Sequence, residues 1–253
     1  MELGIIRISE SRKVAMLLFC LFIFLPFSAS AQIGEHRNKF SVGVNGGYVM
    51  SNVGFTPTVT QGWHSGATAG VSFRYVCEKY FSTICSVMAE VNYASIGWKQ
   101  DITTALDQPV IGDQGSAEKY ERTINYVQIP VFAHLAWGRE ERGFNFFFHI
   151  GPQFGFYLND KVSKNYNEPN ISEEGGRGNT ITAQETMPIE NKFDYGIAAG
   201  GGVEYSHPKL GHFLLEGRYY YGLGNIYDDS KRDYFGKSNF GNIVIKATYF
   251  FDL

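Results

Sequence analysis

The sequence has 253 residues, of which 44% are hydrophobic and 16% aromatic, and its formal net charge is -3. After the first thirty residues, no apolar run approaches the roughly 20 residues that a membrane-spanning helix requires, which excludes a helical membrane protein beyond that point. The mild acidity argues against a nucleic-acid partner. Abundant Phe, Tyr and Gly favour strands joined by tight turns.

The N-terminal segment has the three successive parts of a secretory signal. The basic part consists of Arg7, Arg12 and Lys13. An apolar stretch follows over residues 14–27, and the small residues Ala29, Ser30 and Ala31 come after it. This order predicts a signal peptide over residues 1–31, cleavage between Ala31 and Gln32, and one exported domain over residues 32–253. The alternative is a retained membrane anchor, which we disfavour because the apolar stretch is short for a membrane span.

Alternation of apolar and polar residues with a period of two recurs eight times in the exported domain. This period is typical of strands that have one apolar face. The expected strands, in chain order, are 40–50, 65–76, 83–94, 123–137, 144–158, 192–205, 213–221 and 242–253. Pro130 and Pro152 fall inside two of them, and we expect each to mark a bulge or a strand end, because proline cannot donate to a ladder.

The connections between these strands alternate between long and short. In chain order they are 51–64, 78–82, 95–122, 138–143, 159–191, 206–212 and 222–241. Bacterial outer-membrane barrels have short periplasmic turns and longer external loops. With an even number of strands, both chain termini then lie in the periplasm.

Alternation alone does not say which face of each strand points inward. A soluble, lipocalin-like barrel has the same period with its apolar face inside. An eight-stranded barrel, however, has room inside only for side chains. One face of the expected strands is rich in Phe and Tyr, whereas the other carries mainly Gly, Ser, Asn and Thr. We therefore expect the bulky face to contact lipid, in an all-β, eight-stranded antiparallel transmembrane β-barrel.

Charged residues occur on the polar faces of the expected strands. They are Arg74, Glu90, Asp194, Glu204, Glu216, Arg218 and Lys246. Both signs are represented, and unpaired buried charges are costly, so we expect a network of ion pairs inside the lumen. The alternative is that some of these residues lie near strand ends in water. A lumenal network predicts a plugged interior in place of an open pore.

Two cysteines, Cys77 and Cys85, flank the expected short turn over residues 78–82. A strand register centred on Phe81 would place them opposite each other, and an exported protein meets an oxidising compartment. The sequence leaves two equal alternatives, which are a disulfide at the periplasmic end of the barrel and a pair of free buried thiols.

Signals for catalysis and metal binding are weak. His134 and His149 lie within expected strands, and we interpret them as residues that pack the lumen and not as members of a Ser-His-acid site. Asp228, Asp229 and Asp233 offer carboxylates for Ca²⁺, but a solvated loop is the favoured interpretation. We expect no catalytic, metal-binding or cofactor-binding residues.

Two short motifs resemble a known family. The stretch from Tyr126 to Val131 (YVQIPV) is similar to the strand motif Y-[LV]-x-I-P-[LV] of the Bacteroidetes outer-membrane β-barrel family, which includes PorT-like proteins. The stretch from Gly151 to Gly155 (GPQFG) resembles the strand that follows it. The resemblance extends over about residues 38–253 and implies an outer-membrane location. It also implies a link to protein secretion, in which the named member of the family takes part.

These features predict a non-enzymatic outer-membrane barrel with a structural or assembly role in secretion. A second hypothesis is a binding or adhesion barrel that uses the connections 95–122 and 159–191 as surface loops. A third and less favoured hypothesis is an enzyme that modifies outer-membrane lipid. The expected partners are outer-membrane lipid and secretion or envelope proteins, with no nucleic acid and no cofactor.

Overall fold

The computed structural model describes residues 34–113, 115–140, 142–172, 174–227 and 234–253. The predicted signal peptide and its cleavage site at Ala31 and Gln32 lie outside the described residues, as do Asp228, Asp229 and Asp233. Residues from Glu35 onward form one unit. The described residues contain no helix that is both long and apolar enough to cross a membrane.

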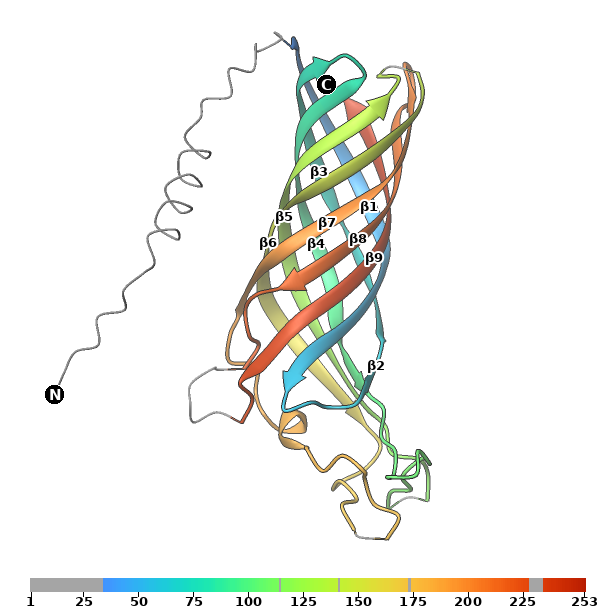
Figure 1. Cartoon of the computed structure of the whole chain (residues 1–253), viewed down its shortest axis with the longest axis vertical. Helices are drawn as coiled ribbons and strands as arrows, with labels where there is room; N and C mark the ends of the chain where they lie inside the picture. Colours follow the sequence, from blue (N-terminus) through green and yellow to red (C-terminus); the bar gives the residue numbers. More distant parts are fainter. Residues whose placement is uncertain (1–33, 114, 141, 173, 228–233) are drawn as a thin grey trace, which may run out of the picture. The chain divides into compact units, whose positions relative to one another are not determined.

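Eight long antiparallel strands close into a ring, as the sequence predicts (Figure 1). They are β1 (Glu35–Thr56), β3 (His64–Tyr80), β4 (Thr83–Gln100), β5 (Tyr120–Gly138), β6 (Gly143–Lys164), β7 (Phe193–His207), β8 (Gly211–Gly222) and β9 (Lys237–Asp252). Consecutive strands pair with each other, and β9 pairs with β1 to complete the ring. The two-residue β2 (Gln61–Gly62) pairs with the end of β4, and the short 3-10 helix η1 (Ala183–Glu185) lies in the longest connection.

Several strands extend further than the alternation indicates, at the end of the barrel that carries the long connections. The strand expected to end at Ala94 runs to Gln100 as β4. Ile96 and Trp98 are 1% and 0% exposed, and the intervening Gly97 is buried as well. Because both faces of β4 are covered here, no alternation marks this part of the strand.

The bulky apolar face points outward. On β7, Tyr195 and Ile197 are 46% and 50% exposed, whereas Asp194 and Ala198 are 5% and 0% exposed. Exposed aromatic and aliphatic side chains recur on the other long strands and form a belt around the barrel. Such a belt suits contact with lipid. The arrangement is the reverse of the lipocalin-like alternative, whose apolar face points inward.

The lumen differs from the predicted lining of small polar residues, because large rings also point inward. The buried rings, each at most 4% exposed, belong to Tyr126, Phe132, Phe147, Tyr220 and Phe250. Glycines on neighbouring strands leave the space for them. A Cβ at Gly43 would lie 2.8 Å from the Phe250 ring, and one at Gly196 would lie 2.8 Å from the Tyr220 ring. Each ring fills volume that a glycine leaves, so the interior is closely packed.

Pro130 and Pro152 lie in the middle of β5 and β6, so the expectation of a bulge or a strand end was wrong. Pro130 pairs with Gln153 of β6 but has no partner in the described β4 ladder. Pro152 pairs with Ile197 of β7 but has none in the described β5 ladder. Each proline therefore interrupts the ladder with only one of its two neighbouring strands, because its missing N–H leaves one hydrogen bond unmade there. Beyond the proline, the interrupted ladder resumes in the same register.

The register beside the β3–β4 turn also differs from the one centred on Phe81. An irregularity between Val76 and Glu78 shifts the pairing by one residue, so Cys85 faces Glu78 and not Cys77. The extra residue at such a bulge has no partner of its own, which is why the two cysteines are not opposite each other. Both thiols are free and partly buried.

A charge placed on the outward face of β6 should destabilise the barrel according to its depth in the lipid. We expect Ile150→Arg, in the middle of the strand, to lower the free energy of unfolding by about 2–4 kcal/mol. Leu158→Arg, nearer the loops, should cost about 0–1 kcal/mol. The two side chains are a matched pair, at 46% and 47% exposed. Urea unfolding in lipid vesicles measures the difference, and equal losses would contradict the lipid-facing assignment.

Candidate functional site

The charged residues predicted to line the lumen are all buried, each no more than 5% exposed. Four of them form one group, which we call the lumenal cluster: Glu90, Glu216, Arg218 and Lys246. Arg74 and Glu204 form a separate ion pair. Asp194 has no ion-pair partner among the described residues and instead accepts a hydrogen bond from Tyr220 at 2.6 Å. The structure therefore brings together two groups and leaves Asp194 outside both.

The lumenal cluster joins opposite walls of the barrel. The Arg218 guanidinium donates to both carboxylate oxygens of Glu90 at 3.0 Å, and Lys246 Nζ lies 2.6 Å from Glu90 Oε1. Arg218 also pairs with Glu216 at 2.7 Å, and Lys246 pairs with Glu216 at 3.3 Å. Because β4 and β8 are equally distant around the ring in either direction, the Glu90–Arg218 bonds span the lumen.

Neutral side chains surround the lumenal cluster and exclude water from it. The Arg218 guanidinium lies 4.4 Å from the centre of the Phe132 ring, and Phe132 stacks on His149 with 4.4 Å between ring centres. Asn92 donates to Glu90 at 2.8 Å. The two acids and two bases balance each other, which is the condition under which buried charges are tolerated.

His134 and His149 face each other across the β5–β6 ladder and are 1% and 0% exposed. The His134 ring centre lies 4.9 Å from that of Phe147. Within the described part of the chain, neither imidazole has a hydrogen-bond partner. Both rings therefore contact other rings and take part in filling the lumen.

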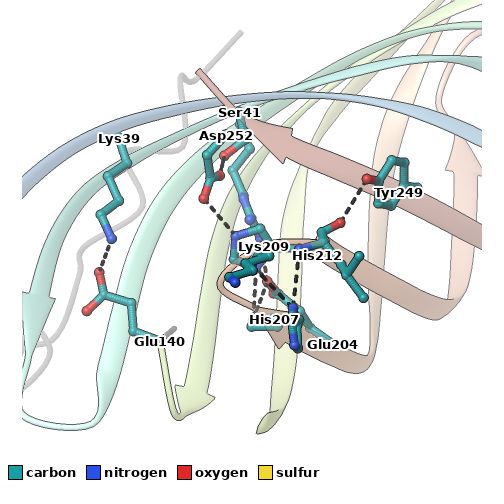
Figure 2. Close-up of polar contacts among 12 residues, drawn as sticks. Lys39, Ser41, Glu140, Glu204, His207, Lys209, His212, Tyr249 and Asp252 are labelled. Atoms are coloured by element: carbon teal, nitrogen blue, oxygen red, sulfur yellow. Dashed lines mark hydrogen bonds and ion pairs between the residues drawn. The ribbon is translucent and has the colours of Figure 1, made fainter. Parts of the chain in front are cut away.

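A chain of polar contacts leads from the Arg74–Glu204 pair to the end of the barrel that carries the short turns (Figure 2). Glu204 Oε1 lies 2.8 Å from His212 Nδ1, and His212 Nε2 lies 3.2 Å from Asp252 Oδ2. The Ser41 hydroxyl donates to Asp252 at 2.5 Å. These contacts link β3, β7, β8, β9 and β1, so they hold the last strand of the barrel at the seam with the first.

A cavity of about 260 Å³ lies beside this chain of contacts, and we call it the turn-end cavity. Its lining includes His212, His207 and Glu140, and Figure 2 shows Lys39 reaching toward Glu140, with Nζ 3.6 Å from Oε1. Sequence reasoning missed the lining residues His207 and Glu140 because they lie at a strand end and in a turn. No alternation extends into such positions to indicate where a side chain points.

Ser206, His212 and Asp252 also meet at this end, since Ser206 Oγ lies 2.8 Å from His212 Nδ1. The serine is 0% exposed. Its hydroxyl also lies 3.3 Å from both Asn145 and Glu204, so it is not presented to a substrate. The described residues contain no group of three or more His, Cys, Asp or Glu that could hold a metal ion.

At the opposite end, the long connections pack together around an aromatic core. Phe55 of β1 lies 5.4 Å from Trp98 of β4, 6.2 Å from Tyr227 and 4.9 Å from Phe235, measured between ring centres. The Tyr227 hydroxyl donates to the Gln184 carbonyl at 3.0 Å, which joins the two last long connections. We call the described parts of connections 57–63, 101–119, 165–192 and 223–236 the loop cap.

A buried ion cluster fastens the loop cap. Arg177 Nε lies 2.7 Å from Glu118 and Nη1 lies 2.5 Å from Glu185, which joins connection 165–192 to connection 101–119. The Tyr166 hydroxyl donates to Glu185 at 2.7 Å. Burial by itself lowers the pKa of Arg177, but its bonds to Glu185, Tyr166 and Glu118 outweigh that effect and raise the pKa. Arg177 therefore stays cationic at neutral pH.

A second cavity, also of about 260 Å³, lies within the loop cap, and we call it the loop cavity. Connections 57–63, 101–119 and 165–192 all contribute to its lining. Its walls carry both polar side chains, among them Gln100 and Arg177, and apolar ones, among them Ile102 and Ile181.

A family model described as outer membrane protein beta-barrel domain matches residues 30–228. Among solved structures is that of Ail, the attachment invasion locus protein of Yersinia pestis, in complex with the heparin analogue sucrose octasulfate. Ail is 14% identical to this chain, the match covers 84% of this chain and 99% of Ail, and the TM-score is 0.38. Neisserial surface protein A is 12% identical, with coverages of 84% and 97% and a TM-score of 0.38. OprG from Pseudomonas aeruginosa is 10% identical, with coverages of 86% and 98% and a TM-score of 0.39. No curated protein matches the sequence.

Removal of one base from the lumenal cluster should leave a buried charge uncompensated. We expect Lys246→Met to lower the free energy of unfolding by about 3–5 kcal/mol, since one partner of a buried pair is lost. Adding Glu90→Gln makes the cluster neutral again, so the double variant should recover most of that loss. Urea unfolding in lipid vesicles measures both variants. A double variant less stable than Lys246→Met alone would show that charge balance does not stabilise the lumen.

Proposed function

The chain belongs to the family of outer membrane protein beta-barrel domains, and from that premise we propose that it is a non-enzymatic barrel whose loop cap binds a partner outside the cell. The single observation that carries the proposal is the folded state of the loop cap. Long connections are the usual sites of recognition when a rigid scaffold presents them. Here the scaffold is the outer-membrane β-barrel.

The loop cap is organised before any partner arrives. Connection 223–236 packs the Tyr227 and Phe235 rings against Phe55 of β1. The ion cluster around Arg177, whose side chain is 3% exposed, joins connections 101–119 and 165–192. Gly178 donates to the Thr103 carbonyl at 2.8 Å, which brings two connections into direct backbone contact. A surface that is already ordered loses little conformational entropy on binding, and this favours affinity.

The filled lumen supports a function that does not depend on solute passage. The lumenal cluster spans the barrel, and Phe132 and His149 stack beside it. We expect planar-bilayer recordings of the full chain to show no large, stable conductance, because side chains occupy the path. Recordings of the wild-type protein that show large, long-lived channels at all voltages would contradict this prediction.

A structural or assembly role in secretion, which the PorT-like resemblance implies, is the second candidate. The observation that favours it is the turn-end cavity, which lies at the end of the barrel where both chain termini are expected. A periplasmic partner could insert a side chain there. The third hypothesis, an enzyme that modifies lipid, is disfavoured because the Ser206 hydroxyl is buried among Asn145, Glu204 and His212.

A gene-deletion strain that carries plasmid copies of the protein tests the proposal. Arg177→Ala leaves Glu118 and Glu185 buried without their cation, which should destabilise the loop cap by about 3–5 kcal/mol and spare the barrel. Lys164→Ala is the control, because Lys164 also contacts the Tyr166 ring but bonds only to an exposed carbonyl. Proteolysis of intact cells should cleave the Arg177→Ala loops faster than those of the wild type or of Lys164→Ala.

The readouts on these strains are cell attachment, the profile of secreted proteins and the composition of lipid A. We expect attachment to be lost in the deletion strain and with Arg177→Ala, and to be retained with Lys164→Ala. Secreted proteins and lipid A should not change. If the deletion strain loses secretion and the Arg177→Ala copy fully restores it, the assembly role is favoured. Altered lipid A in the deletion strain would favour the enzyme.

A further inference from the structure

We infer that the loop cavity binds one ring of a neutral, hydroxyl-rich ligand, namely a carbohydrate. The inference rests on the proposed function, because it names the chemical class that the loop cap recognises. It is carried by the cavity, by two buried donors without partners in its lining, and by the charge of the groups around it.

The walls of the loop cavity are held in place by contacts between connections. Asn179 donates from its side chain to the Thr58 carbonyl at 3.0 Å, and the backbone of Gly178 donates to the Thr103 carbonyl at 2.8 Å. Gly178 lies so close to the next connection that a Cβ there would be 2.9 Å from the backbone nitrogen of Ala105. Any larger residue would push the two connections apart, so the cavity is a built feature of the loop cap.

Two buried donors in this lining have no partner. Gln100 and Arg177 are 7% and 6% exposed, and both line the cavity. Among the described residues, neither Gln100 Nε2 nor Arg177 Nη2 has a hydrogen-bond acceptor. A buried donor without an acceptor is costly, and the two nitrogens therefore favour a ligand that brings acceptor oxygens.

The charge around the loop cavity disfavours an anionic ligand. Glu118 and Glu185 more than balance the charge of Arg177. Asp101 and Asp107 also line the cavity, so its surroundings are negative as a whole. A carboxylate or sulfate would be repelled, whereas the several hydroxyl groups of a sugar can accept from the two nitrogens and donate to the two aspartates.

The size and the apolar wall of the loop cavity match one sugar ring. Its volume of about 260 Å³ is below that of pockets for drug-sized ligands, which begin at about 300 Å³. Val59, Ile102 and Ile181 provide the apolar wall, against which the C–H face of a ring can pack. Further rings of a longer glycan would then lie outside, in solvent.

The test uses full-length protein in lipid nanodiscs and two sets of sugars, each with a neutral, an anionic and a cationic member. One set is glucose, glucuronate and glucosamine, and the other is galactose, galacturonate and galactosamine. Saturation-transfer NMR and calorimetric titration report binding. We expect at least one neutral sugar to bind, and its uronate to bind at least tenfold more weakly.

Gln100→Leu removes one of the two donors at nearly constant volume. It should weaken the affinity for the neutral sugar about two- to tenfold, as expected for one lost hydrogen bond. Gln108→Leu is the matched control, since it makes the same change eight residues further along the chain, on an exposed residue outside the cavity lining. It should leave the affinity unchanged. Circular dichroism and loop proteolysis verify that both variants are folded.

The outcomes are decisive in either direction. Neutral binding that Gln100→Leu weakens and Gln108→Leu does not would support the inference. Absence of binding by every neutral sugar, binding by charged sugars alone, or equal affinity in both variants would overturn it. If the sugars fail but attachment still depends on Arg177, the loop cap retains its proposed function with another ligand. If attachment is independent of Arg177, the proposed function fails by itself.

Discussion

The interior of an eight-stranded ring holds side chains and little else, and this limit on volume governs the whole barrel. Some large inward rings occupy space that a glycine on a neighbouring strand leaves, as Phe250 does beside Gly43. The same limit explains why charged groups inside must satisfy one another, because no water is available to them. Glu90 therefore contacts both Arg218 and Lys246 directly. Filling and neutralising the lumen are two results of one geometric restriction.

A filled lumen moves any chemistry of recognition to the two ends of the barrel. One end is held by the contacts of Glu204, His212 and Asp252, which lie beside the turn-end cavity. At the other end, the last connection packs Phe235 against Phe55 at the end of β1, and Phe55 in turn contacts Trp98 at the end of β4. The barrel acts as a support for the connections of the loop cap, and its rigidity limits the number of conformations that they can adopt.

Alternation was sufficient to predict the strand count, because each strand carries its signal independently of the others. The outward apolar face needed a second argument, namely that an eight-stranded ring has no room inside for the bulky Phe and Tyr face. Alternation failed where more than one face is covered, as at Ile96 and Trp98, and it did not foresee inward rings such as Phe132. The loop cap was beyond its reach for a different reason. The partners of Arg177 are Glu118, far away in the sequence, and Glu185, and nothing periodic relates them. The bulge beside Cys77 likewise leaves no mark in the sequence pattern.

The seam joins β1 and β9, the first and last strands of the barrel, along nearly their whole length, from the Ser41–Asp252 pair to the Thr56–Lys237 pair. The first strand must wait for its partner until the rest of the chain has been synthesised and exported. Until then it presents an open edge that invites pairing with other molecules. Contacts so distant in sequence also form slowly. Biogenesis therefore requires that the unfolded chain be shielded in transit and that closure be the final event of insertion.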